Sequence, residues 1–159
     1  MTRRLLVVLF LLLPPSLAVH ATKPGIEPLD AFPRSNLVIQ AKGAAHAFEV
    51  WVADTPPRRS QGLMYVKKLD RGTGMLFVYG EPQVITMWMK NTLIPLDMLF
   101  VARDGRITRI ARNASPRSLG VISSLGMVSG VIELGGGEAS RLGIEQGDRV
   151  VHAVFSQNR

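Results

Sequence analysis

The stretch from Met87 to Phe100 constrains the fold of this chain more than any other part of the sequence. Two apolar, strand-like arms flank a short polar centre, Lys90-Asn91-Thr92, and Pro95 restricts the backbone where the second arm begins. Few folds need this order of segments. The stretch therefore predicts two strands joined by a short polar loop.

Short strand-like runs separated by turn residues make up most of the remaining chain. We expect strands at residues 37–40, 47–53, 75–79, 85–89, 96–102, 107–112, 127–134 and 150–155. Asp104-Gly105 lies between two of these runs and predicts a type I′ hairpin turn. Short helices are expected at residues 56–62, after an N-cap at Thr55, and at residues 138–142. Because no βαβ spacing occurs, the pattern predicts a mostly β fold, an antiparallel sandwich or barrel with one or two short helices.

The N-terminal residues predict an exported protein. Arg3 and Arg4 precede nine apolar residues, 5–13, which are too few to span a bilayer that needs about 20. Small residues then allow cleavage after Ala21, or alternatively after Ala18. An uncleaved membrane anchor is the other interpretation. We expect a periplasmic protein of a Gram-negative bacterium, with no stable membrane insertion after cleavage.

The chain has room for one domain. Residues 1–21 are the expected signal peptide, residues 22–36 a flexible arm with three prolines, and residues 37–159 a single β domain. The sequence contains no cysteine, so packing alone must stabilise the domain in an oxidising compartment. We expect a monomer.

The positive charge of the chain is spread along its length. The formal net charge is +7, of which the predicted signal peptide carries two arginines. Nucleic-acid binding usually needs a concentrated basic stripe, and export argues against it independently, so we expect no nucleic-acid partner. Weak attraction to anionic lipid headgroups or cell-wall polymers stays open.

Motifs for nucleophilic or metal-dependent catalysis are absent from the sequence. There is no Gly-x-Ser-x-Gly elbow, no His-Glu-x-x-His pair and no phosphate-binding loop of the Walker type. Beyond residue 21, His46 and His152 are the histidines, and both lie in strand-like runs. We therefore expect no cofactor, and a binding or structural, accessory role in the cell envelope rather than catalysis.

Several polar side chains stand among apolar neighbours, where burial costs free energy unless the charges are paired. They are Arg59, Lys90, Asn91, Asp97 and Glu133. One interpretation pairs Arg59 with Glu133 and Lys90 with Asp97 as a structural network. The other makes these residues the lining of a pocket for a small polar or anionic ligand, with Trp88 as a stacking wall.

Two further functions remain as alternatives. Asp97 and Glu133 could form the acid and base of a glycan-directed hydrolase, if both carboxyl groups faced one cleft. Met87 and Met89 would share one face of a strand, and their thioether groups could bind Cu(I). The same spacing is explained by methionines that fill a core.

Four motifs occur in an order that resembles the family called domain of unknown function 192. They are Arg59-Ser60-Gln61-Gly62-Leu63-Met64, Gly74-Met75-Leu76-Phe77, Trp88 to Asp97, and Glu133-Leu134 followed by Gly137 and Gly147-Asp148. The resemblance implies a mostly β, jelly-roll-like sandwich. It implies no reaction, and so transfers no catalytic residue. Gly135-Gly136 departs from the family pattern, in which a less flexible pair is common at this place.

Overall fold

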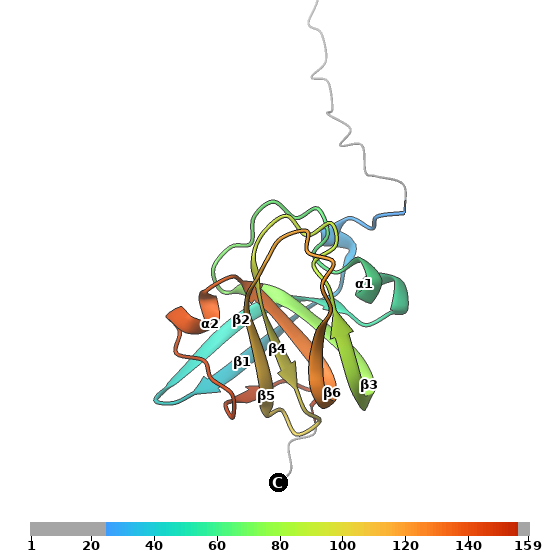
Figure 1. Ribbon diagram of the computed structural model, residues 1–159. Coiled ribbons are helices and arrows are strands. Elements are labelled where there is room, and N and C mark those ends of the chain that lie inside the picture. Colours follow the sequence, from blue (N-terminus) through green and yellow to red (C-terminus); the bar gives the residue numbers. More distant parts are fainter. Residues whose placement is uncertain (1–24, 156–159) are drawn as a thin grey trace, which may run out of the picture.

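Seven strands form a single sheet that curls into a half-barrel (Figure 1). The computed structural model describes residues 25–155, so the predicted signal peptide lies outside the described residues. The strands are β1 (Arg34–Ala41), β2 (Ala44–Ala53), β3 (Thr73–Met87), β4 (Leu96–Val101), β5 (Ile107–Ala114), β6 (Ile122–Gly135) and β7 (Arg149–Val151). The helices are the 3₁₀ turn η1 (Leu29–Ala31), α1 (Pro56–Gln61) and α2 (Glu138–Arg141).

The strand order is β5-β4-β6-β3-β2-β1-β7, and the sheet is mixed. β2 and β3 run parallel, whereas the other pairs of named strands in the described residues are antiparallel. A parallel pair needs a crossover connection. Residues 54–72, which include α1, supply it. The prediction of a mostly β fold with short helices is confirmed, but the purely antiparallel arrangement is wrong, and one curled sheet replaces the expected sandwich.

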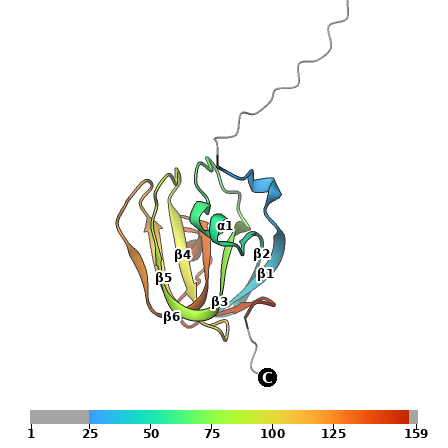
Figure 2. The ribbon, with the colours of Figure 1, turned by 90° about the vertical axis from the view of Figure 1, so that its right-hand side faces the viewer.

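The two ends of the sheet meet near β7. The amide of Ile107 donates to the carbonyl of Asp148 at 2.8 Å, and that of Val150 donates to Gly105 at 2.7 Å. β7 also pairs with β1, so three residues join both ends of the sheet. Figure 2 shows the resulting curl, with β4, β5 and β6 on one side and β1 and β2 on the other.

The hairpin between β4 and β5 exists, but its turn is not type I′. A type I′ turn needs positive φ at both central residues. The amide of Gly105 donates to the carbonyl of Ala102 at 3.0 Å, so the central residues of the turn are Arg103 and Asp104. Neither Arg103 nor Asp104 has a positive φ. Gly105, which follows them, has a φ of 85° and forms a bulge.

Two further local predictions differ in detail. The run expected at residues 75–79 and the first part of the run expected at 85–89 form one long strand, β3, with register shifts between Val78 and Gln83 and between Val84 and Thr86. Trp88 and Met89 lie beyond the end of this strand. The described part of the expected arm packs against the fold: Phe32 is buried, and Glu27 forms a 2.9 Å ion pair with Arg58 of α1. The predicted helix after the Thr55 N-cap is confirmed as α1.

The central strands are covered by side chains on both faces. Met75, Phe77, Met98, Phe100 and Val131 belong to one buried cluster, which we call the first core. Their sequence neighbours Leu76, Leu99, Ile132 and Leu134 belong to a second cluster on the other face. This alternation decides where the polar residues on these strands point. Within residues 25–155, no helix is long and apolar enough to cross a membrane.

Candidate functional site

A cleft opens where β3 separates from β2. The two strands pair only as far as Ala53 and Phe77, whereas β3 continues beside β6 to Met87. Between α1 and the second half of β3 lies an open space of about 410 Å³. Its lining residues are Pro56, Arg59, Ser60, Tyr79, Thr86, Met87, Trp88 and Val121.

A narrow recess shares part of this lining and reaches into the first core. The recess has a volume of about 20 Å³, roughly the space of one water molecule, and shares Arg59, Ser60, Met87 and Trp88 with the cleft. Glu133 lies among the residues that line it. The shared walls therefore bring a buried carboxyl group and a cleft residue, Arg59, to one site.

Glu133 sits in an apolar environment. In the sheet register it lies opposite Met75 of β3 and Met98 of β4, and the residue is 4% exposed. Among the described residues, its carboxyl group has neither a hydrogen bond nor an ion pair. Burial raises the pKa of Glu133 to about 8, because the charged form loses hydration without gaining a partner. The group is therefore mostly protonated at neutral pH and can donate a hydrogen bond.

Arg59 is fixed in the wall of the cleft by backbone carbonyls. Its Nη1 atom donates to the carbonyl oxygens of Asp54 and Val78, both at 2.8 Å. The guanidinium carbon lies 5.1 Å from the centre of the Tyr79 ring. Within the described part of the chain Arg59 has no acidic partner, so the predicted ion pair with Glu133 is not formed. Its positive charge remains available to the cleft.

Trp88 lines both the cleft and the recess, and Lys90 lines the recess. Trp88 is 50% exposed, and the Lys90 Nζ atom lies 5.1 Å from the centre of its ring. Asn91, by contrast, has a backbone role. Its φ of 57° is a left-handed conformation that asparagine tolerates, and its side-chain Nδ2 group donates to the Met64 sulfur at 3.7 Å.

Asp97 belongs to a different part of the structure. The residue is fully buried, and its carboxylate accepts hydrogen bonds from the amides of Asn113 at 2.8 Å and Ala139 at 2.9 Å. Because Met98 pairs with Glu133 and Asp97 pairs with Leu134, the two carboxyl groups lie on opposite faces of the sheet. The structure therefore brings Asp97 together with neither Lys90 nor Glu133.

The two methionines of the copper alternative are both buried in the first core. The hydroxyl group of Tyr79 donates to the Met87 sulfur at 3.6 Å. Met87 lines the cleft and the recess, but Met89 lines neither. The cleft thus receives one methionine of the pair, and packing explains the position of the other.

Sequence reasoning missed Ser60, Thr92 and Tyr79. Ser60 follows Arg59 in the first motif, and Thr92 ends the polar centre Lys90-Asn91-Thr92, so both could have been included on proximity alone. Tyr79 carried no local signal, because its position depends on the place where β3 leaves β2.

These features define a small protein with a mixed β half-barrel and a polar cleft beside a short helix. The chain belongs to the family of domain of unknown function 192 (DUF192), described as an uncharacterized ACR, whose model matches residues 37–152. The resemblance seen in the sequence motifs is thereby confirmed.

Two solved structures are similar to this one. A protein from Sinorhizobium meliloti 1021, described as a candidate transcription regulator, is 42% identical; the match covers 77% of this chain and 96% of that chain, with a TM-score of 0.76. A protein of unknown function from Novosphingobium aromaticivorans DSM 12444 is 34% identical, with 87% and 99% coverage and a TM-score of 0.76. No curated protein matches the chain.

Proposed function

We propose that this is an exported, non-catalytic binding protein of the cell envelope that takes a small polar or anionic ligand in the cleft between α1 and β3. The observation that carries the proposal is Glu133, a buried carboxyl group without a partner in the described residues, which lines a recess contiguous with the cleft. A buried polar group without a hydrogen bond costs free energy. A ligand atom in the recess would supply the missing partner.

The walls of the cleft define the chemistry of the ligand. Protonated Glu133 donates one hydrogen bond, and Arg59 and Lys90 add positive charge, so the group that enters the recess is an acceptor such as a carboxylate or hydroxyl oxygen. Trp88 offers a half-exposed flat face for an apolar or ring-shaped part of the same ligand. The small recess admits one such oxygen rather than a bulky group.

Glycan hydrolysis is the second candidate, favoured by the raised pKa of Glu133, which suits a general acid. Most glycoside hydrolases, however, need two carboxyl groups that flank one bond. Glu133 is the one acidic residue among those that line the cleft and recess, and Asp97 faces the other side of the sheet. Ligand binding needs only one buried carboxyl group in the recess, whereas glycan hydrolysis needs two, so we favour binding.

Transcription regulation, the role given to the relative from Sinorhizobium meliloti, is not proposed for this chain. A recognition helix must be long enough to lie in the major groove. In the described residues, α1 and α2 have six and four residues.

A ligand screen tests the proposal. The melting temperature would be measured with monocarboxylates, sugar acids, neutral monosaccharides and inorganic phosphate, for the wild type and for Glu133→Gln, Arg59→Ala and Trp88→Ala. We expect one chemical class to stabilise the wild type and to lose most of its effect in all three variants. Glu49→Gln is the matched control, because Glu49 is exposed and pairs with Arg34 away from the cleft. If no class stabilises the wild type, or if the variants respond equally, the binding proposal is wrong.

A further inference from the structure

Three loops form one continuous surface at the upper end of the molecule in Figure 1. We call the surface of residues 62–70, 88–95 and 115–121 the loop platform. Its loops are joined by backbone hydrogen bonds: Tyr65 donates to Asn91 at 2.9 Å, Arg117 to Thr92 at 3.0 Å, and Met89 to Ser118 at 3.0 Å. The platform is therefore a defined surface of the fold.

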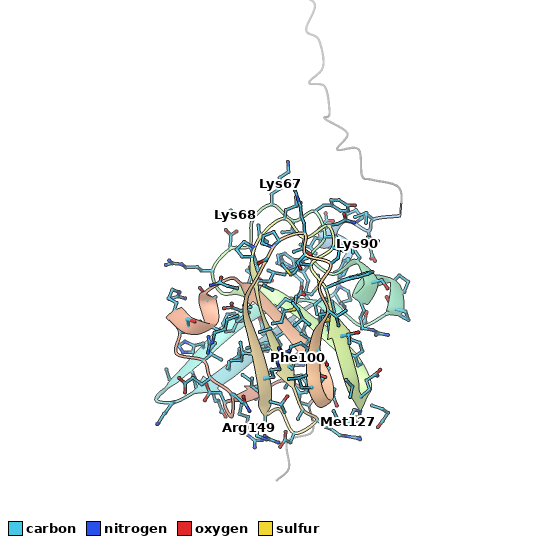
Figure 3. All side chains as sticks on the ribbon, viewed as in Figure 1. Lys67, Lys68, Lys90, Phe100, Met127 and Arg149 are labelled. Carbon is cyan, nitrogen blue, oxygen red and sulfur yellow. The ribbon has the colours of Figure 1, made fainter. Side chains whose placement is uncertain are left out.

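The loop platform carries a concentrated positive charge. Its charged residues are Lys67, Lys68, Asp70, Lys90 and Arg117. Asp70 pairs with Lys68 at 2.6 Å, and no acid of the described chain pairs with the other three cations. Figure 3 shows the three lysines together at this end.

At the lower end of the molecule, two arginines are paired with acids. Arg103 pairs with Glu81 at 3.2 Å, and Arg106 lies 4.0 Å from Asp104. Cations without an acidic partner also occur elsewhere in the described chain: Arg112 donates to Ser140 and to the Ile144 carbonyl, and Arg149 donates to the Asp104 carbonyl. The loop platform brings three such cations together on one surface.

Large apolar side chains are exposed on the same platform. Trp88, Leu119 and Val121 are 50%, 68% and 73% exposed. Trp88 and Val121 both line the cleft, so they lie near each other at its rim. Tryptophan and exposed aliphatic residues beside lysines are the chemistry that suits the boundary between lipid headgroups and acyl chains. Nucleic acid would use the cations but not the aliphatic side chains.

We propose that the loop platform docks on an anionic lipid bilayer. The cations contact phosphate groups, Leu119 and Val121 enter the headgroup region, and Trp88 lies at the interface. The described chain also begins at this end of the molecule, at Gly25 (Figure 1). In this orientation Trp88 and Val121, which also line the cleft, face the membrane. The inference does not depend on the proposed ligand.

Vesicle binding tests the charge component. The full chain, as purified after export, would be sedimented with phosphatidylglycerol-containing vesicles and with pure phosphatidylcholine vesicles. We expect binding to the anionic vesicles that weakens with added salt. Lys90→Glu with Arg117→Glu should lower the affinity at least about tenfold. Arg103→Glu with Arg106→Glu changes the net charge equally at the lower end and should alter it less than about twofold.

A matched pair of double variants tests the contribution of the apolar side chains to vesicle binding. Leu119→Ser with Val121→Ser should weaken vesicle binding, whereas Leu125→Ser with Met127→Ser, exposed residues outside the platform, should not. Trp88 fluorescence should shift to the blue on anionic vesicles, and Trp88→Phe should remove that shift. Circular dichroism would confirm that each variant is folded.

Three outcomes would overturn the inference. The first is equal binding of the loop-platform and lower-end charge variants to anionic vesicles. The second is equal binding to neutral and anionic vesicles. The third is binding to duplex DNA or a soluble polyanion as tight as to vesicles, with no change in Trp88 fluorescence, which would assign the platform to a polyanion instead of a bilayer.

Discussion

Glu133 and Asp97 show how two buried carboxyl groups take different roles in a single sheet. Asp97 is buried on one face, and its carboxyl oxygens accept hydrogen bonds from two backbone amides. Glu133 is buried on the other face opposite two methionines, and its pKa rises to about 8. The difference arises from hydrogen bonding rather than from burial, because both residues are at most 4% exposed.

The raised pKa of Glu133 predicts a pH dependence of stability. In the unfolded chain this carboxyl group has its ordinary pKa of 4.5, whereas in the folded chain burial raises the pKa to about 8. The folded state therefore binds more protons between these values, and stability falls as the pH rises through this window, by an amount on the order of 4 kcal/mol. Glu133→Gln should remove this decline and be more stable than the wild type at pH 8.

Chemical denaturation at several pH values between 5 and 8.5 would measure the effect. Glu49→Gln is again the control, because it makes the same substitution at a half-exposed site away from the recess. Parallel curves for the wild type and Glu133→Gln would show that Glu133 ionises normally, and would remove the hydrogen-bond donor from the proposed site.

Asp97 is predicted to be a structural residue that acts independently of Lys90. Asp97→Ala removes both acceptors of the Asn113 and Ala139 amides and should cost about 3–5 kcal/mol of stability. Lys90→Ala should change stability by less than about 0.5 kcal/mol, because Lys90 is exposed. Since the two side chains form no ion pair, denaturation of the double variant should give the sum of the single effects. A coupling above about 1 kcal/mol would contradict the observed separation.

At the scale of elements, the connection from β6 to α2 depends on close backbone approach. The amide of Gly136 donates to the carbonyl of Pro95 at 2.9 Å. A Cβ atom at Gly136 would lie 2.6 Å from the Asn113 side chain and 2.8 Å from the Pro95 Cβ, whereas one at Gly135 would meet nothing within 4 Å. The two glycines thus have different reasons to be there.

These neighbours make a paired prediction for the glycines. Gly136→Ala should destabilise the protein by about 1–3 kcal/mol, because Pro95 and the backbone must shift to accept the methyl group. Gly135→Ala adds the same methyl group into open space and should change stability by less than about 1 kcal/mol. Thermal melts of both variants would check this. Equal losses would mean that the loop relaxes freely.

An element could be predicted from the sequence where neighbouring residues alone determine it. Thr55 and Pro56 are adjacent in sequence, so α1 could be predicted; Gly105 marked a hairpin, although not its turn type. The parallel pairing of β2 and β3 depends on the path of residues 54–72, which no local pattern describes. The sequence nominated Arg59, Trp88, Lys90 and Glu133 for one site, and the structure brings these four residues to one recess. The sequence could not place Asp97 on the opposite face, because that depends on the strand register.

At the scale of the whole molecule, processing of the N-terminus remains a prediction. If the signal peptide is removed after Ala21, the intact mass of the exported protein should correspond to residues 22–159. Cleavage after Ala18 would add three residues to that mass. A protein recovered from the periplasmic fraction with residues 1–21 still attached would contradict the prediction and support an anchor.

The short strand β7 has a consequence for how the molecule can be made. Residues 149–151 join β1 and the start of β5, so the two ends of the sheet cannot be connected until this C-terminal segment is in place. These contacts have long sequence separations, and such contacts form slowly. A chain that passes through a translocation pore with its N-terminus first would therefore leave the pore before it could complete its fold. Because the sheet closes late, the chain would stay unfolded enough to pass through the pore. A sheet closed by its first strands would obstruct that passage.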